Sequence, residues 1–573
     1  MQEAGPSSEK QHMEQPLSDH GIGEEIFLIP YRITQSMVRP CCEIRGTAWA
    51  GSDQGTAFQL EDIPGKDGSA LEKTCDILVV GGGGAGLVAA ARAAQAGTKK
   101  VIVLEKAKNT GGGMQFARTQ RVFGSRWQKD RGLPDVTASY LREVMDATWW
   151  RLDPGLALNT VKATGEFFDW FCELAEPEEV ALFHEGKYMQ EQYDGPVGPQ
   201  LDEPGNPAAC GRIYMNVMRR KCNEFGVEIL TSHRAVRSEV KDGKIAAVEA
   251  DGPEGRVLIR CGICILACGS WVNNQEVTKK YYPGFYDAQI HHHVDVCPHT
   301  NPDYTGDGFS LIRGLDVDQD EKNLALRLMG PMVFTHNRVI GSMCSSPFAI
   351  TVNQNARRFV CEPSQVRMKM NASGIVQMNQ PEGAVYVLFN SDTLGAAVRY
   401  RKEHPSEKQG PFDATDLPET LEEAENELQE YVDRKKDSKK FFLADSVEML
   451  AKEIEMDPAA LEDQIRIYNN SCRKGFDEQC FKDASYLVPF EKGPYYAVKT
   501  ILSTDGAFGG ALVNKDMQAL HRDRSPVQDL YVAGDFASGR FINMAGVKVQ
   551  LINDMSWALA SGFIAGTNAG NAD

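Results

Sequence analysis

Residues 76–86 read Asp76-Ile77-Leu78-Val79-Val80-Gly81-Gly82-Gly83-Gly84-Ala85-Gly86, and a run of small residues follows. The apolar residues 77–80 predict a buried strand. Gly81, Gly83 and Gly86 have G-x-G-x-x-G spacing, which lets backbone N–H groups and a helix N-terminus approach a pyrophosphate. The stretch therefore predicts the first half of a nucleotide-binding βαβ unit.

The second strand of this unit is predicted at Val101-Ile102-Val103-Leu104, followed by Glu105 and Lys106. Glu105 stands where a carboxylate accepts hydrogen bonds from ribose hydroxyls, about 20 residues after the glycines. A glycine-rich turn alone is weak evidence, because such turns also serve simple helix packing. Strand, glycines, helix, strand and acid in this order favour a dinucleotide site.

The composition limits the class of protein. The 573 residues are 42% hydrophobic and 24% charged, which is enough for at least two globular units. A net charge of -18, with 79 acidic against 61 basic residues, argues against nucleic-acid binding. No apolar run approaches the roughly 18–20 residues of a membrane span. The first 25 residues also lack the apolar core of a signal peptide, so we expect a cytoplasmic protein whose 14 cysteines are mostly reduced.

Compositional changes along the chain suggest its organisation. Residues 1–24, rich in Glu, Gln, Ser and Pro, predict a disordered tail, and residues 25–71 predict an N-terminal appendage. Helices are expected over 136–150 and 156–174, and a charged surface helix over 417–440. Asp242-Gly243 predicts a hairpin turn.

From Thr74 to the C-terminus the order of motifs resembles the FAD-dependent fumarate reductase and 3-ketosteroid dehydrogenase superfamily. The matching pieces after the glycine-rich turn are Ala267-Cys268-Gly269-Ser270, Thr305-Gly306-Asp307-Gly308, Gly493-Pro494-Tyr495-Tyr496-Ala497, Gly509-Gly510 and Ala533-Gly534-Asp535. The resemblance implies an α/β fold, with a Rossmann-like FAD-binding domain and an inserted α+β cap domain behind the short appendage. Its parts would be 72–330 and 504–573 for the FAD-binding domain, and 331–503 for the cap.

The resemblance also implies which residues contact FAD. In this family Gly534-Asp535 closes the cofactor site, and the next helix, expected at about 549–566, points its N-terminus at the flavin pyrimidine edge, where negative charge gathers on reduction. The implied contacts are Gly81, Gly83, Gly84, Ala85, Gly86, Glu105, Lys106, Gly112, Gly113, Met114, Ala267, Gly269, Asp307, Gly534, Asp535 and Val549. Residues 111–116 hold no histidine that could link the flavin, so we expect non-covalent FAD. The chain has no haem-binding Cys-x-x-Cys-His, so electrons should pass to or from a separate donor or acceptor.

Enzymes of this superfamily add or remove two hydrogens across a carbon–carbon bond next to a carbonyl or carboxylate. Leu394 stands where fumarate reductases keep their proton-donating arginine, and Asp505 begins the stretch that replaces their His-x-Thr-Met-Gly-Gly. A dicarboxylate needs several cationic donors, so fumarate is an unexpected substrate. In related enzymes this stretch joins the cap back to the FAD-binding domain, so the resemblance implies that Asp505 and the loop to Gly510 line the substrate side of the flavin.

The ketosteroid branch matches at Pro494-Tyr495-Tyr496-Ala497, which gives Tyr496 the role of assisting the substrate carbonyl or proton. If the register is one residue off, Tyr495 takes that role. The alternative is that Tyr496 is a core aromatic residue with a satisfied hydroxyl. Lys548, near the position of a substrate-clamping arginine, is either a functional cation or a surface lysine. Arg358 is expected to order the cap through Glu362.

Two groups of residues in the sequence have the composition of a metal site. His291-His292-His293, with Asp295 and His299, would place His291, His293 and Asp295 on one face if the segment were a strand. Its position before Thr305-Gly306-Asp307-Gly308 favours substrate contact or plain surface. Cys261 and Cys264 lack a second cysteine pair and predict buried strand thiols. We therefore predict no metal.

The leading hypothesis is an FAD enzyme that reduces or forms a C=C bond conjugated to a carbonyl in a bulky, apolar, steroid-like substrate. A reductase of an unsaturated carboxylic acid, such as an aryl acrylate or a fumarate-like acid, is the first alternative, with Lys548 holding the carboxylate. The second alternative is an electron-transfer flavoprotein subunit.

Overall fold

The computed structural model describes residues 71–572, apart from 118–119, 186–198, 202–208, 293–302, 333–336, 364–368, 405–416, 435–439 and 545–546. Residues 63–573 belong to one compact unit. The predicted tail, and the predicted appendage up to residue 70, lie outside the described residues.

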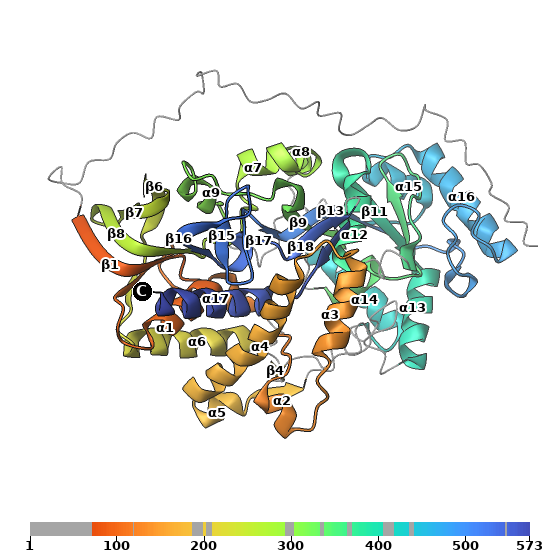
Figure 1. Ribbon diagram of the computed structural model, residues 1–573. Coiled ribbons are helices and arrows are strands. Elements are labelled where there is room, and N and C mark those ends of the chain that lie inside the picture. The colour runs from red at the N-terminus through yellow and green to blue at the C-terminus, as the bar shows by residue number, and fades with distance from the viewer. Residues whose placement is uncertain are drawn as a thin grey trace, which may run out of the picture. The chain divides into compact units, whose positions relative to one another are not determined.

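The glycine-rich turn follows an inner strand of a mostly parallel sheet, whose strand order is β15-β16-β8-β1-β2-β5. Figure 1 labels β15, β16, β8 and β1 of this sheet. These strands are β15 (Gln518–Leu520), β16 (Pro526–Val532), β8 (Gly255–Leu266), β1 (Leu71–Val80), β2 (Val101–Leu104) and β5 (Glu228–Leu230). In β1, Ile77 pairs with Val101 of β2 and with Ile263 of β8. β6 (Arg234–Lys241) and β7 (Lys244–Gly252) form the hairpin predicted at Asp242-Gly243 and extend the sheet from β8.

Helices cover the sheet and build the rest of this domain. They are α1 (Gly84–Ala94), α2 (Arg126–Asp130), α3 (Thr137–Ala147), α4 (Pro154–Leu174), α5 (Pro177–Val180), α6 (Ala209–Glu224), α7 (Gln275–Tyr281), α8 (Pro283–His292), α9 (Gly308–Leu311) and α17 (Asp554–Asn571). Short elements between them are η1 (Gly112–Phe116), β3 (Phe183–Glu185), β4 (Pro199–Leu201), η2 (Glu321–Asn323), β14 (Ala511–Leu512), η5 (Gly534–Phe536), β17 (Ala537–Ser538), β18 (Phe541–Met544) and β19 (Val547–Gln550). The helices expected over 136–150 and 156–174 are α3 and α4.

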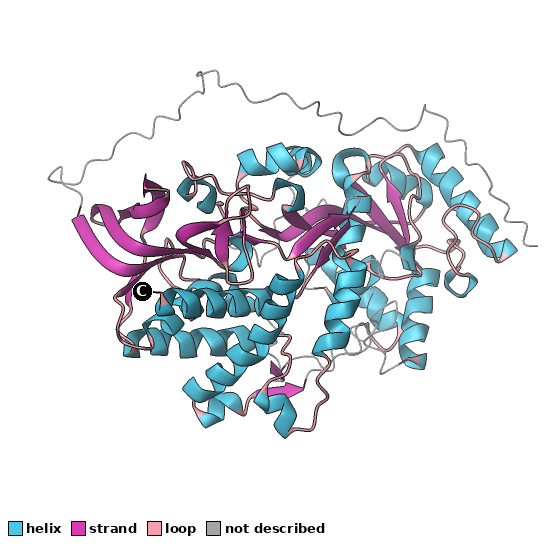
Figure 2. Cartoon of the chain, in the orientation of Figure 1, coloured by secondary structure: helices cyan, strands magenta, loops and turns pink. Residues whose placement is uncertain are grey.

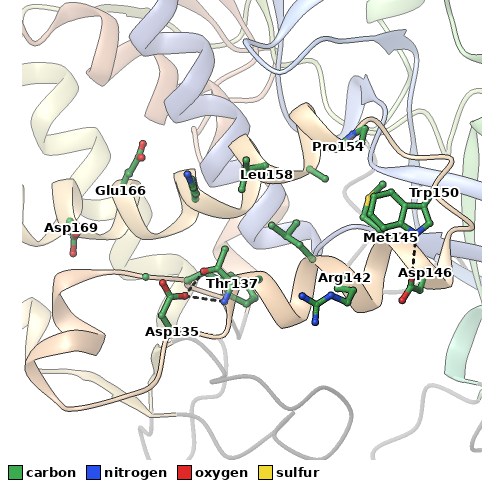
Figure 3. A pocket seen from close by; sticks show the side chains of 16 residues that line it. Asp135, Thr137, Arg142, Met145, Asp146, Trp150, Pro154, Leu158, Glu166 and Asp169 are labelled. Atoms are coloured by element: carbon green, nitrogen blue, oxygen red, sulfur yellow. Dashed lines mark hydrogen bonds between the residues drawn. The ribbon is translucent and has the colours of Figure 1, made fainter.

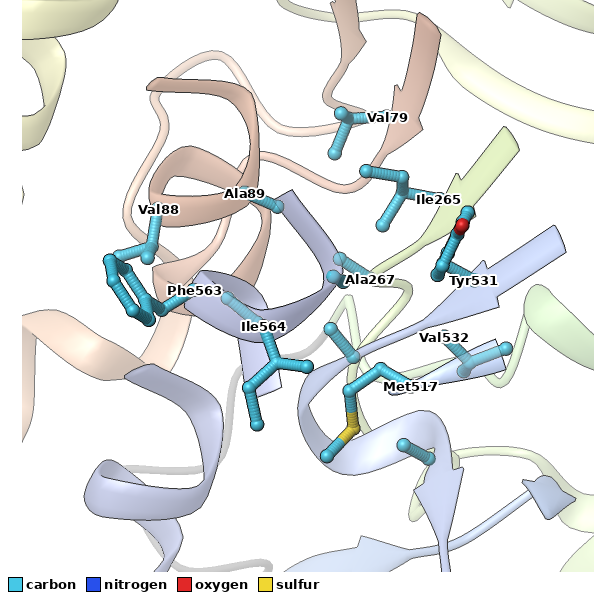
Figure 4. Packing of buried hydrophobic residues seen from close by; sticks show 14 of the residues in the cluster. Val79, Val88, Ala89, Ile265, Ala267, Met517, Tyr531, Val532, Phe563 and Ile564 are labelled. Carbon is cyan, nitrogen blue, oxygen red and sulfur yellow. The ribbon is translucent and has the colours of Figure 1, made fainter. Parts of the chain in front are cut away.

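Helices α1 and α17 approach each other closely because α17 presents glycines to alanines of α1. Gly562, Gly566 and Gly570 recur every fourth residue, and so lie on one face of the helix. A Cβ added at Gly562 or Gly566 would overlap the backbone of Ala85 or Ala89, respectively. Figure 4 shows the apolar side chains beside this contact, among them Val88, Phe563 and Ile564, packed next to the sheet.

The second sheet is antiparallel and forms the cap, with strand order β10-β11-β13-β12 and with β9 paired to β13. Its strands are β9 (Ala325–Met332), β10 (Ile350–Asn353), β11 (Ala384–Asn390), β12 (Phe441–Ala444) and β13 (Tyr495–Phe508). The accompanying elements are α10 (Arg338–Cys344), α12 (Lys369–Met378), η3 (Pro381–Gly383), α13 (Ser391–Glu403), α14 (Leu421–Arg434), α15 (Val447–Glu453), α16 (Pro458–Lys474) and η4 (Ala484–Tyr486). Figure 2 shows the strands of both sheets in magenta.

Two long strands connect the cap with the FAD-binding domain. The boundaries predicted after residues 330 and 503 fall inside β9 and β13, which pair with each other. The fold is nonetheless the predicted α/β class, with a mixed, mainly parallel main sheet and a separate α+β region. The charged helix expected over 417–440 is the shorter α14, and the helix expected at about 549–566 begins later, at Asp554.

Candidate functional site

Each of the three motif glycines differs from the others in what a side chain at its position would contact. Gly81 has φ +109°, and a Cβ there would overlap the carbonyl oxygen of Ala267. A Cβ at Gly86 would overlap the carbonyl oxygen of Gly81, so this glycine allows the helix to pack against the strand. A Cβ at Gly83 would meet no protein atom within 4 Å. The open space in front of Gly83, at the N-terminus of α1, fits a pyrophosphate.

Glu105 closes the loop on the β2 side. Its Oε2 accepts a hydrogen bond from the Gly82 N–H at 2.7 Å, and its Oε1 accepts one from the Ala107 N–H at 2.7 Å. Burial raises the pKa of the Glu105 carboxyl, although these two backbone donors oppose the shift. The carboxylate is therefore fixed at the end of β2, where the sequence predicts the ribose.

A network of charged side chains lies on the same side of the site. Lys106 Nζ lies 2.7 Å from Oδ2 of Asp307, and Arg234 Nη2 lies 2.7 Å from Oδ1 of the same carboxylate. Burial opposes ionisation of Asp307, but the two cations outweigh it and hold the pKa of that carboxyl below its usual value. Lys106 and Asp307 thus form an ion pair with each other.

The strand order assigns the two halves of a dinucleotide to opposite sides of β1. Glu105 ends β2 on one side, while Ala267 follows β8 and Gly534 follows β16 on the other. Gly534 has φ +70°, its N–H donates to Ser561 Oγ at 2.9 Å, and its carbonyl accepts from Trp557 Nε1 at 2.8 Å. We therefore expect the adenosine on the β2 side, and the redox half of the cofactor on the side of β8, β16 and the first turns of α17.

The remaining residues that the resemblance implies for the cofactor lie on several segments of the FAD-binding domain. Gly112, Gly113 and Met114 belong to η1, and the Met114 side chain packs where a Cβ of Gly84 would stand. Gly269, at φ +73°, follows β8. The helix range that included Val549 was wrong: Val549 lies in β19, because a β18–β19 hairpin precedes the helix and Asn553 is its N-cap residue.

The structure adds charged residues that the motifs did not single out. Arg540 is fully buried and contacts Asp535 and Asp554, and Arg327 of β9 forms an ion pair with Asp554. Buried Arg121 donates from Nη1 to the Tyr140 hydroxyl at 2.9 Å. The sequence did contain a signal for the start of this helix. Asn553-Asp554 precedes an apolar run, and such a pattern is typical of a helix N-terminus. Nothing in the local sequence links Arg327 to that helix.

The predicted catalytic residues do not all gather on the redox side. Tyr496 is 2% exposed and stacks on Phe389 of β11, with ring centroids 4.9 Å apart, and on Phe441 of β12. Burial raises the pKa of its phenol well above the ordinary value. Tyr495 donates from its hydroxyl to the Glu491 carbonyl at 2.7 Å. These contacts favour the packing role for Tyr496, the alternative that the sequence left open.

Asp505 and Lys548 are described by their backbones only. Asp505 lies in β13 beside Gly506, which pairs with Arg327, and Lys548 pairs with Asn543 across the β18–β19 hairpin. Their roles remain predictions.

The cap contains the buried ion pair expected from Arg358. Its Nη2 lies 2.8 Å from Oε2 of Glu362 and 2.9 Å from Oδ2 of Asp477, and Lys482 Nζ lies 3.1 Å from Oε2 of Glu362. All four side chains are buried, so the network orders the cap interior.

The histidine run is not the strand that a shared metal-binding face would require. His291 and His292 belong to α8, while His293, Asp295 and His299 lie outside the described residues. Cys261 and Cys264 both lie in β8, where Cys264 is buried and Cys261 is half-buried. Among the residues that the structure describes, no group of three His, Cys, Asp or Glu side chains could hold a metal ion.

A separate cavity of about 790 Å³ lies between α3 and α4 (Figure 3). Leu141, Met145, Trp150 and Leu158 contribute apolar surface, and Asp135 and Glu166 add charge. None of the predicted cofactor or catalytic residues lines it, so this cavity is distinct from the dinucleotide site.

Taken with the strand order, the turn at Gly83, the acid at Glu105 and the segment at Gly534 define a dinucleotide-binding protein of the Rossmann type. The FAD binding domain family matches residues 76–545. The chain belongs to this family, and it is an FAD-dependent oxidoreductase.

Similar proteins support the same assignment. The chain is 24% identical over 477 residues to a vinyl phenol reductase of Lactiplantibacillus plantarum, covering 81% of this chain and 90% of that protein. A 3-ketosteroid Δ1-dehydrogenase of Sterolibacterium denitrificans has a similar structure, with a TM-score of 0.63, 16% identity and coverage of 87% of this chain and 99% of that chain. A flavocytochrome c3 fumarate reductase gives a TM-score of 0.61 at 20% identity, covering 87% and 78%. In the described part of the chain, no helix is long and apolar enough to cross a membrane.

Proposed function

We propose that this enzyme reduces or forms a C=C bond conjugated to a carbonyl in a bulky, largely apolar substrate. Bound FAD would supply the two-electron chemistry, so the protein residues determine which substrate is held against it. The names of the similar proteins support carbon–carbon chemistry, because they describe a vinyl phenol reductase, a ketosteroid dehydrogenase and a fumarate reductase.

The observation that carries the proposal is the position of Arg327. On β9 it pairs with Gly506 of β13, and its guanidinium is held by Asp554, the first residue of α17. Its side chain is 23% exposed. A fixed cation with this exposure, on the redox side of the sheet, can hold a carbonyl oxygen and stabilise the negative charge that develops there.

The same cation also supports the alternative substrate, an unsaturated carboxylic acid. A carboxylate would accept charge-assisted hydrogen bonds from Arg327, and Lys548 is the second predicted cation. Asp554 already neutralises much of the charge of Arg327, which is why an uncharged carbonyl is the leading choice.

An anaerobic substrate panel tests the proposal. The FAD of the purified enzyme is reduced chemically, and flavin absorbance is followed after adding a cyclic enone, an aryl acrylate or fumarate. We expect the enone to reoxidise the flavin fastest. Faster reoxidation by the acrylate selects the acid alternative, and no reoxidation by any of them favours an electron-transfer subunit.

Substitution of Arg327 tests separately whether this residue holds the substrate carbonyl. Arg327→Gln should lower kcat/KM for the active substrate by about 10²-fold or more, the scale measured for one transition-state donor. FAD content should be unchanged. Arg338→Gln, an exposed arginine of cap helix α10 that pairs with Glu427, serves as the matched control. Unchanged kcat/KM in Arg327→Gln would remove the main support for the proposal.

A further inference from the structure

A second glycine-rich segment lies beside the first. Gly111 forms an isolated β-bridge with Gly83, and the N–H of Gly111 donates to the Gly82 carbonyl at 2.7 Å. A Cβ at Gly112 would stand 3.5 Å from the Cα atom of Gly83. Residues 110–112 therefore border the turn in front of which a pyrophosphate fits.

Arg219 of helix α6 holds this segment from the side of that helix. Its Nε donates to Oγ1 of Thr110 at 2.8 Å, and its Nη2 donates to the backbone carbonyl of the same residue. A Cβ at Gly111 would overlap Nη2 of Arg219, 2.5 Å away. Gly111 also has φ +110°, so both the backbone and the contact with the arginine require glycine at this position.

The hydrogen bonds of Arg219 fix one peptide group of the segment. The Thr110 carbonyl and the Gly111 N–H belong to the same planar peptide and point in opposite directions. The carbonyl accepts from Arg219, and the N–H donates to Gly82. Arg219 therefore sets the direction in which the Gly111 N–H meets the glycine-rich turn.

The side chain of Thr110 makes a second connection between the arginine and the turn. Thr110 is 7% exposed, and its Oγ1 accepts from Arg219. Its Cγ2 methyl group would lie 3.0 Å from a Cβ at Gly82, so it packs against that glycine. A movement of Arg219 would thus be transmitted to Gly82 by two separate contacts.

Arg219 differs from the arginine next to it in the charge of its partners. Arg220 donates to both carboxylate oxygens of Glu179, at 3.0 and 2.7 Å. The remaining hydrogen bond of Arg219 runs from Nη1 to the side-chain oxygen of Asn216 at 3.1 Å, so its acceptors among the described residues are all neutral. Partial burial lowers the pKa of its guanidinium. A nearby anion would stabilise this half-buried cation.

We propose that Arg219 is a positioning residue of the cofactor site, which fixes residues 110–112 against Gly82 and Gly83 before FAD binds. A preformed wall strengthens binding, because less conformational entropy is lost when the ligand arrives. Its positive charge also favours an anionic group in front of the turn. The proposal rests on the assignment of FAD to this family and is independent of the substrate.

Titration of the apoprotein with FAD tests the proposal. Arg219→Gln should raise the dissociation constant about 10- to 100-fold, which is about 1.4–2.8 kcal/mol and the scale of one hydrogen bond to a charged group. The pyrophosphate is the same in oxidised and reduced FAD, so both dissociation constants should rise by the same factor. The midpoint potential of the holoenzyme should then equal that of the wild type.

Two results would overturn the proposal. One is a wild-type dissociation constant in Arg219→Gln. The other is a midpoint potential changed by about 30 mV or more, because this corresponds to a tenfold difference between the two dissociation constants and would place Arg219 at the flavin ring.

The neighbouring arginine provides the matched control. Arg220→Gln makes the same chemical change one residue further along α6, but Arg220 contacts Glu179, so the affinity for FAD should stay at the wild-type value. Arg219→Lys keeps the charge without the fork of donors, and its dissociation constant should lie between those of Arg219→Gln and the wild type. If Arg219→Gln does not fold, Arg219→Lys decides, and wild-type affinity in it overturns the proposal.

A double-mutant cycle tests whether Arg219 acts through Thr110. Thr110→Val keeps the shape of the side chain but removes the Oγ1 acceptor, so it should raise the dissociation constant about 2- to 10-fold. In the Arg219→Gln background the same substitution should have no further effect, because that hydrogen bond is already lost. Additive effects of the two substitutions would show that Arg219 does not act through this segment, which would overturn the proposal.

Discussion

Gly83→Ala separates cofactor binding from folding. Gly83 is the N-cap residue of α1, with φ −77° and ψ −167°, a conformation that alanine adopts without strain. An added Cβ would have no protein neighbour within 4 Å. Replacing glycine by alanine lowers the conformational freedom of the unfolded chain, which stabilises a protein by about 0.4–1 kcal/mol. Alanine is, however, a poorer N-cap residue than glycine, and this costs a similar amount. The apoprotein should therefore unfold at nearly the same denaturant concentration.

The effect on FAD binding should be larger. The new methyl group would occupy the space in front of the first turn of α1, where the pyrophosphate accepts hydrogen bonds from backbone N–H groups. Losing one hydrogen bond to a charged group costs about 1.5–3 kcal/mol. At about 1.4 kcal/mol per factor of ten, the dissociation constant of FAD should rise about 10- to 150-fold. Gly83→Val, with a larger side chain, should abolish binding.

Fluorescence titration of the apoprotein with FAD gives the dissociation constant, and urea unfolding gives the stability. Gly341→Ala is the matched control, because a Cβ at Gly341 in the cap helix α10 would also meet nothing within 4 Å. It should leave the affinity for FAD unchanged. Wild-type affinity in Gly83→Ala would show that the pyrophosphate does not lie at this turn.

Three further predictions concern the flavin linkage, Tyr496 and Glu362. Acid precipitation should release the flavin into the supernatant, and colour retained in the pellet would reveal a covalent bond. Because Tyr496 is buried and stacked, Tyr496→Phe should keep turnover within about tenfold; a fall of about 10² to 10⁴ would instead identify a general acid. Burial opposes ionisation of Glu362, but Lys482 and Arg358 hold the pKa of its carboxyl below the usual value, so it stabilises the cap above about pH 4.3 and less as pH falls through that lowered pKa. Glu362→Gln should cost about 3–5 kcal/mol at neutral pH and should weaken this acid dependence, measured by urea unfolding at several pH values.

The features that the sequence predicted are those that depend on local pattern. The βαβ unit, the hairpin at Asp242-Gly243 and helices α3 and α4 each follow from residues adjacent in the chain. The ion pair of Arg358 with Glu362 is also local, since the two residues are four apart. In such cases the spacing of apolar residues, glycines and charges determines the structure with little help from distant segments.

The features that the sequence missed depend on pairing between distant segments. Arg327 and Asp554 are 227 residues apart, and only the pairing of β9 with β13 brings Arg327 to the start of α17. The start of α17 itself was expected too early, because β18 and β19 form a hairpin before it. Tyr496 matched a family motif, yet its side chain packs against Phe389 and Phe441, which come from two other strands.

The two ends of α17 serve different purposes, and this couples cofactor binding to folding. Its glycines allow it to contact α1, whose N-terminus we expect to face the pyrophosphate, while its first residue, Asp554, forms ion pairs with Arg327 and Arg540. We therefore expect FAD to bind to segments that α17 already holds together. A ligand that binds only the folded protein stabilises it by RT ln(1 + [L]/Kd), so bound FAD should also protect α17 and β9 from local unfolding.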